Sequence, residues 1–243
     1  MFKNLLPFSF DSRLFALLTA GFFAFTIIGT VSHESGHYLM ARCFGFEAEI
    51  NYQSTYYNLS DNDMSFLKET WTKYGTQLKS DQPFPGKERY NKINAFYKRA
   101  GVWPLAGGPL QTMLTGTIGL ILLIFLRRRY FTAERLSFGL WLVIFIALFW
   151  LRQTANFFVG LSMSLINGSI SRRSDEFGLA RYFQLPWWSI WSLTALIGLV
   201  VLVVVIFKFV PKAQRLTFMT SGILGGVTGY VFWLVLFGKL IMP

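Results

Sequence analysis

Residues 14–37 carry the sequence LFALLTAGFFAFTIIGTVSHESGH, in which a long apolar run leads directly into a pair of histidines. The nineteen residues from Leu14 to Ser32 contain no charged side chain. A run of this length is about what a helix needs to cross the hydrocarbon core of a bilayer. We therefore expect a first transmembrane helix that continues into the histidine motif. Ionisable groups at such a depth are costly, so they should face a protein interior or a wet cavity.

A cleaved signal peptide is the competing interpretation of this run, because Phe2 and Lys3 precede it. Its apolar region would be long, and no clean Ala-x-Ala cleavage site appears before the motif.

The composition indicates a membrane protein throughout. Of 243 residues, 53% are hydrophobic and only 14% are charged, which is too few charges to coat a soluble domain of this size. Further apolar runs lie at Trp103–Leu126, Trp187–Phe207 and Leu216–Phe237, and a less regular one at Leu136–Ser171. We predict an all-α polytopic membrane protein with about five transmembrane helices, if the irregular run crosses once. Two crossings of that run are the alternative.

The net charge of +11 does not indicate nucleic-acid binding, because the basic residues gather beside the apolar runs instead of interleaving with aromatic residues. They are typical of topology signals in a multi-pass protein whose partner is the lipid bilayer. The positive-inside rule then places the N-terminus in the cytoplasm.

One polar region separates the first two apolar runs, which divides the chain into 1–44, 45–102 and 103–243. An amphipathic helix is expected in it, because apolar residues recur at three- and four-residue steps from Met64 to Leu78. A second short helix is expected at Lys87–Arg99, and an edge strand at Glu47–Tyr52.

The motif His33-Glu34-Ser35-Gly36-His37 contains both histidines of the chain. On a helix, residues four apart share a face, so both imidazoles can reach one Zn²⁺ while Glu34 flanks it as a catalytic base. The alternative is a pair of helix histidines satisfied by hydrogen bonds. The single cysteine, Cys43, excludes a thiolate cage, so the other ligands must be nitrogen or oxygen atoms.

A tetrahedral catalytic zinc needs one more protein ligand, for which a downstream carboxylate is expected. The candidates in or beside the apolar runs are Glu134, Asp175 and Glu176. A single crossing by the second run puts Glu134 on the membrane side opposite His37, whereas Asp175 returns to the side of His37. The alternative for Asp175 is a carboxylate that stabilises a helix start.

Glycines followed by proline stand at the start of the second run, as Gly107-Gly108-Pro109. They favour a helix that is opened or distorted so that its backbone lines a cavity. With these residues, the histidine motif and the segment Arg173-Ser174-Asp175-Glu176, the chain resembles the site-2 protease family of intramembrane zinc metalloproteases. The resemblance implies that His33, His37 and Asp175 bind zinc and that Glu34 activates water. The leucine–aspartate–glycine sequence usual around the third ligand is absent here.

Several residues are candidates for substrate binding. They include Gly107, Gly108 and Pro109, and also Gln111, which stands near the place where the family commonly has an asparagine. Arg152 and Asn156 interrupt an apolar run. Arg152 would pair with Asp175 or Glu176 or hold a peptide carbonyl, or else it marks a helix end at the headgroups. Glycines 222, 225, 226 and 229 of the last run predict helix–helix contact.

The function expected from this sequence is the hydrolysis of peptide bonds in membrane-anchored protein or peptide substrates by zinc-activated water. One alternative is a metallopeptidase of the prenyl-protein endopeptidase type, in which a glutamate such as Glu176 would be the third ligand. Another is a non-catalytic membrane scaffold or chaperone that retains the fold.

Overall fold

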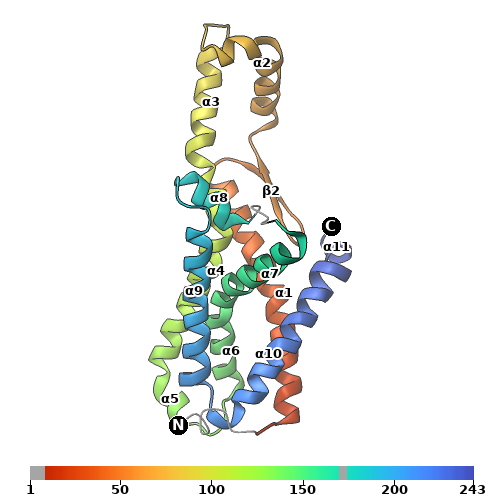
Figure 1. The fold of residues 1–243 in the computed structure, drawn as a ribbon, viewed down its shortest axis with the longest axis vertical. Coiled ribbons are helices and arrows are strands. Elements are labelled where there is room, and N and C mark those ends of the chain that lie inside the picture. The colour runs from red at the N-terminus through yellow and green to blue at the C-terminus, as the bar shows by residue number, and fades with distance from the viewer. Residues whose placement is uncertain (1–8, 170–173) are drawn as a thin grey trace.

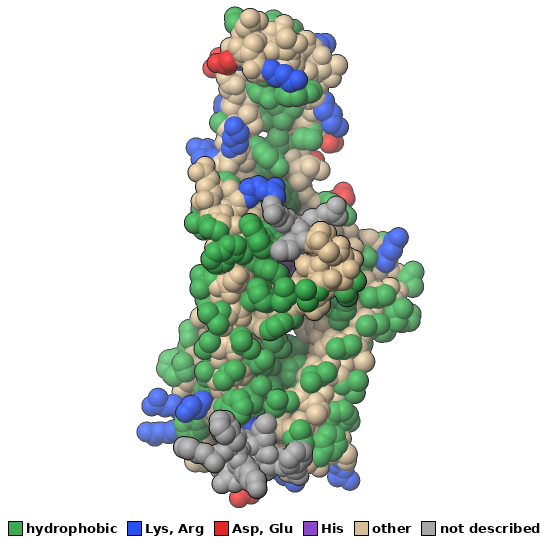
Figure 2. Space-filling model, viewed as in Figure 1, with side chains coloured by type: hydrophobic (Ala, Val, Ile, Leu, Met, Phe, Trp, Pro, Cys, Tyr) green, Lys and Arg blue, Asp and Glu red, His purple; other side chains and the backbone are tan. Residues whose placement is uncertain are grey.

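The computed structural model describes residues 9–169 and 174–243. Within these residues, five helices are long and apolar enough to cross a membrane. They are Ser12–Cys43, Lys87–Phe125, Phe138–Asn167, Ser189–Phe209 and Lys212–Ile241. The expected all-α polytopic membrane architecture is confirmed, and the irregular run forms one candidate span rather than two. Figure 2 shows apolar side chains over much of the visible side of the bundle, with most charged side chains toward its two ends.

The first span is helix α1 (Ser12–Cys43), which carries the histidine motif without a break, as the sequence predicts. Its start is fixed by Asp11, whose side chain accepts hydrogen bonds from the backbone amides of Arg13 and Leu14, both at 3.1 Å. Helix α1 packs along both α4 (Val102–Phe125) and α10 (Arg215–Tyr230).

The polar region forms a hairpin of strands followed by two helices. Strand β1 (Glu47–Ile50) pairs antiparallel with β2 (Thr55–Asn58), and α2 (Asp61–Lys79) and α3 (Lys87–Ala100) project beyond the bundle (Figure 1). The predicted strand and both predicted helices are confirmed. Helix α3 leads directly into α4, so the expected boundary near residue 102 falls inside one long helical segment, Lys87–Phe125.

The third span changes direction near its middle. Helix α6 (Phe138–Ala147) ends in a 3-10 turn, η2 (Leu148–Trp150), and α7 (Leu151–Asn167) then leaves along another line (Figure 1). The polar residues Arg152 and Asn156 lie in the first two turns of α7, immediately after this bend. The break in the apolar pattern therefore marks a bend within one span.

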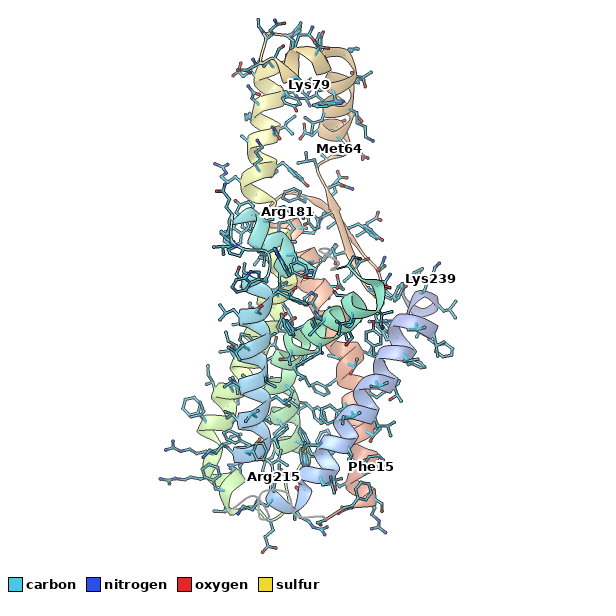
Figure 3. The ribbon with its side chains drawn as sticks, in the orientation of Figure 1. Phe15, Met64, Lys79, Arg181, Arg215 and Lys239 are labelled. Carbon is cyan, nitrogen blue, oxygen red and sulfur yellow. The ribbon has the colours of Figure 1, made fainter. Side chains whose placement is uncertain are left out.

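The remaining elements are the short helices between the spans and the last two spans. A short helix α5 (Arg127–Thr132) follows α4, and α8 (Asp175–Tyr182) precedes α9 (Ser189–Val204). The rest of the chain comprises η3 (Val205–Phe209), η4 (Lys212–Gln214), α10, η5 (Val231–Phe237) and α11 (Gly238–Ile241). Figure 3 places Arg181 of α8 toward the end of the bundle near the β-hairpin, and Arg215 at the opposite end with Phe15.

The glycines of the last span allow α10 to approach α1 closely, as predicted. A Cβ atom on Gly225 would overlap the backbone oxygen of Thr19, and one on Gly229 would come within 2.9 Å of the backbone oxygen of Phe23. By contrast, a Cβ atom on Gly226 would meet no other atom within 4 Å. Three of the four glycines therefore belong to the contact, since Gly222 also faces Phe22.

Candidate metal centre

The two histidines of α1 and Asp175 of α8 converge on one point. The Nε2 atoms of His33 and His37 lie 3.2 Å apart, and Asp175 Oδ2 lies 3.1 Å from the first and 3.2 Å from the second. Both histidines are buried, and the Asp175 side chain is 30% exposed. Although 138 residues separate Asp175 from His37 in the sequence, the fold makes them neighbours.

One face of α4 supports both imidazoles from behind. Pro104, Gly108 and Thr112 follow one another at four-residue steps, so they lie along a single stripe of the helix. The carbonyl oxygen of Pro104 lies 2.7 Å from His37 Nδ1, and Thr112 Oγ1 lies 2.9 Å from His33 Nδ1. Because α1 and α4 run in opposite directions, Pro104 at the start of the stripe meets His37, and Thr112 at its end meets His33.

These contacts decide which ring nitrogen carries the proton. A carbonyl oxygen only accepts, so His37 Nδ1 must donate to Pro104. Thr112 donates its own hydroxyl hydrogen to the carbonyl of Gly108 at 3.0 Å, which leaves its oxygen to accept from His33 Nδ1. In a neutral imidazole the other nitrogen is then unprotonated. Both Nε2 atoms therefore direct lone pairs toward each other and toward the Asp175 carboxylate.

Three lone-pair atoms at such separations repel one another unless a cation lies between them. Ligand atoms around a tetrahedral zinc ion, at ~2.0–2.2 Å from the metal, lie about 3.3–3.5 Å from each other. The observed separations of 3.1–3.2 Å match this spacing to within a few tenths of an ångström. The group His33, His37 and Asp175 could therefore hold a metal ion, and its fixed Nδ1 partners are the supporting contacts that metal-binding histidines need.

Asp175, the one carboxylate of the group, has a lowered pKa. Burial raises the pKa of Asp175, but positive charge at the imidazole Nε2 atoms outweighs burial and holds the pKa below its usual range. A metal cation between these atoms would lower it in the same way. The neighbouring Glu176 behaves differently, because burial raises its pKa. Asp175 lies in the first turn of α8, so it occupies a helix start and the centre at the same time.

Glu34 lies beside the three candidate ligands and is itself buried. Thr55 of β2 holds it from one side, since its hydroxyl lies 2.8 Å from the Glu34 backbone oxygen and 3.2 Å from Oε2 and can donate its hydrogen to either. Arg152 of α7 lies on another side, with Nη2 at 3.9 Å from Oε1. The ion pair of Arg152 is thus with Glu34 and not with Asp175 or Glu176 as expected, because its guanidinium reaches α1, where it also donates to Thr30 Oγ1 at 3.4 Å.

The glycines of α4 serve close packing at the centre. A Cβ atom on Gly36 would come within 2.5 Å of the Gly107 backbone oxygen, and one on Gly108 would overlap the imidazole nitrogens. The helix is continuous through Pro109, so the expectation of an opened helix is wrong. Opening of the helix is unnecessary here, because glycine has no side chain and α4 can therefore approach the histidines closely.

The remaining candidates for substrate binding lie at different distances from the centre. Gln111 packs against Gly36 and donates a hydrogen bond to Thr115 Oγ1 at 3.1 Å. Asn156 lies one turn beyond Arg152 on α7 and is half-buried. Their roles toward substrate, like those of Gly107, Gly108 and Pro109, stay predictions.

Sequence reasoning missed Thr55 and Thr112, the two hydroxyl groups that hold the centre. The four-residue spacing of Pro104, Gly108 and Thr112 was a possible clue, because it repeats the spacing of the histidines. Nothing comparable pointed to Thr55, which comes to Glu34 from a strand of the polar region. Comparison of the chain with protein families, with curated proteins and with solved structures gave no significant match.

Proposed function

We propose that this protein is an intramembrane zinc metalloprotease that hydrolyses peptide bonds of membrane-anchored substrates. The observation that supports this most is the convergence of two imidazole nitrogen atoms and one carboxylate oxygen within 3.2 Å, next to a buried glutamate. Two nitrogen ligands and one oxygen ligand, with a fourth position left for water, are typical of catalytic zinc. When bound, zinc polarises the scissile carbonyl and lowers the pKa of water.

The residues of the chain then divide the work of proton transfer. Glu34 accepts a proton from the attacking water and passes it to the leaving amine nitrogen. Thr55 and Arg152 hold its carboxylate from two sides. Pro104 and Thr112 keep the Nδ1 atoms protonated, so that both Nε2 atoms remain available as ligands.

The position of the centre favours a substrate that is itself in the membrane. His33 and His37 belong to a candidate membrane span, and so does the stripe of α4 behind them. Asp175 is partly exposed at the end of the bundle where the β-hairpin lies. A substrate segment would meet the centre close to this end of the spans.

The replacement Glu34→Gln tests the proposal. An amide fills the same space but cannot accept the proton, so zinc content should be unchanged while cleavage of co-expressed membrane-anchored substrates falls at least ~100-fold. Glu69→Gln on the exposed face of α2 is the matched control and should cleave normally. Near-normal turnover by Glu34→Gln would reject the protease assignment. Wild-type protein that binds no zinc would instead favour the scaffold.

The endopeptidase alternative needs a glutamate as the third ligand. Glu176 is buried, and its Oε2 atom has no hydrogen-bond partner among the described residues. The metal-ligand group found in the described part of the chain contains Asp175 instead. This contact favours the aspartate, and with it the leading proposal.

A further inference from the structure

A second charged feature lies at the opposite end of the bundle from the metal centre. There the connection between α4 and α6 meets the connection between α9 and α10, and together they line a cavity of about 600 Å³. We call it the basic pocket. The lining residues used below are Phe131, Arg135, Lys208, Phe209, Lys212 and Arg215.

Four cationic side chains come to this cavity from separate elements. Arg135 precedes α6, Lys208 lies in η3, Lys212 in η4 and Arg215 at the start of α10. Arg215 is buried and held in place, with Nη2 donating to the Phe207 oxygen at 2.7 Å and Nε to the Val210 oxygen at 3.3 Å. It therefore adds a fixed positive charge to the pocket.

The acidic residue among the lining side chains is Glu134, so positive charge dominates. In the described part of the chain, no salt bridge engages Arg135, Lys208 or Lys212, and all three side chains are exposed. A group of like charges around a cavity repels itself. An anion in the cavity would remove that repulsion.

The positive-inside rule explains basic residues at this end but does not require a cavity. Arg127, Arg128 and Arg129 of α5 satisfy the rule equally well and do not line the pocket. Arg135 and Lys208 are far apart in the sequence, and only the packing of two connections brings them to one cavity. Their arrangement is therefore a separate observation from their sign.

The walls of the pocket indicate where the anion comes from. The rings of Phe131 and Phe209 stack with centroids 6.3 Å apart, and Phe131 is 63% exposed. The pocket lies where apolar spans end, which is the depth of lipid headgroups. Cations around a cavity beside the exposed ring of Phe131 fit a phosphate that carries a glycerol and acyl chains. A free phosphate would make no favourable contact with that ring.

We propose that the basic pocket binds the headgroup of an anionic phospholipid. The bound phosphate would face Arg135, Lys208 and Lys212, with the start of the acyl chains along Phe131. By bridging the two connections, the lipid would stabilise the folded bundle, because a ligand that binds only the folded state raises its stability.

The test compares lipids on the purified full-length chain in a nonionic detergent. Water-soluble short-chain phosphatidylglycerol should bind and raise the unfolding temperature, and short-chain phosphatidylcholine should do so far less. The triple variant R135Q/K208Q/K212Q should weaken phosphatidylglycerol binding roughly a hundredfold, since each nearby cation contributes about fivefold. The variant R127Q/R128Q/R129Q removes the same charge outside the pocket and should bind within about threefold of wild type.

K208R/K212R keeps the positive charge and should bind phosphatidylglycerol as wild type does. If R135Q/K208Q/K212Q does not fold, the single variant K212Q replaces it and should show weaker phosphatidylglycerol binding. Equal losses in both triple variants would overturn the proposal, because the effect would then be surface charge alone. Binding of inorganic phosphate as tight as that of phosphatidylglycerol would also overturn it, because the site would then bind free anions.

Discussion

Asp175 is the residue on which the proposed metal centre depends most. Its Oδ2 atom lies against both imidazoles, whereas the next residue, Glu176, is buried and is not part of the candidate ligand group. Asp175→Ala should therefore lose zinc to ordinary chelators, since removal of one of three protein ligands leaves a weak site. Zinc content measured after dialysis against a chelator checks this.

Glu176→Ala is the matched control for this experiment, because it removes a neighbouring carboxylate from the same turn of α8. It should retain zinc. Retention of zinc by Asp175→Ala together with loss by Glu176→Ala would show that the third ligand is the glutamate.

Thr55 is the residue through which the β-hairpin reaches Glu34, the proposed catalytic base. Thr55→Val keeps the shape but removes the hydroxyl that faces Glu34. A hydrogen bond to a charged group is worth ~1.5–3 kcal/mol, so the catalytic rate constant kcat should fall roughly tenfold or more. KM and zinc content should change little, because the ligands are untouched.

Thr55→Ser restores the hydroxyl and should restore most of kcat. A purely structural role for Thr55 would lower the thermal stability of both variants and leave kcat of the folded enzyme unchanged. Steady-state kinetics with thermal unfolding of the same preparations separates the two.

At the scale of elements, the contact between α1 and α10 is set by the absence of side chains. Gly225→Ala would place a methyl group on the Thr19 backbone oxygen, which a helix avoids only by moving apart. Such overpacking costs ~1–3 kcal/mol, so the unfolding temperature should fall by several degrees. Thermal unfolding in detergent measures the shift.

Gly226→Ala, one residue further along α10, is the control, since its new methyl group would meet open space. It should leave the unfolding temperature unchanged or raise it slightly, because alanine favours helix more than glycine does. Equal destabilisation by both replacements would mean that the two helices do not pack as described.

For the whole molecule, the metal centre requires that the third span crosses once. Asp175 can meet His37 only if the chain returns to the membrane side on which α1 ends, since two crossings would separate them by ~30 Å of hydrocarbon. With Cys43 replaced by serine, single cysteines at Ser80 and Ser169 should be labelled by an impermeant thiol reagent from the same side. Ser80 directly follows α2, and Ser169 lies two residues after the end of α7.

A cysteine at Ser137, before α6, should be labelled from the other side and serves as the control. Labelling of Ser80 and Ser169 from opposite sides would contradict the five-span arrangement and remove Asp175 from the centre. The side that contains Ser137 should be cytoplasmic according to the distribution of Lys and Arg.

The sequence alone predicted the five-span architecture, because the length and charge of an apolar run decide whether it spans a bilayer. It also predicted the continuity of α1 with His33 and His37, since spacing on one helix is a local property. The strand at β1 and the two helices α2 and α3 were likewise visible in their local patterns. These features depend on residues close together in the chain.

Only the tertiary structure decided what surrounds those histidines. Thr112 and Thr55 reach the centre from a second helix and from a strand, and such contacts between distant segments leave no periodic pattern in a single sequence. The pattern Gly107-Gly108-Pro109 predicts an opened or distorted helix, but Gly107 lies against Gly36 and Gly108 against the imidazoles, so both are packing residues. Local pattern determines which segments form helices, whereas the packing of those helices determines which side chains meet.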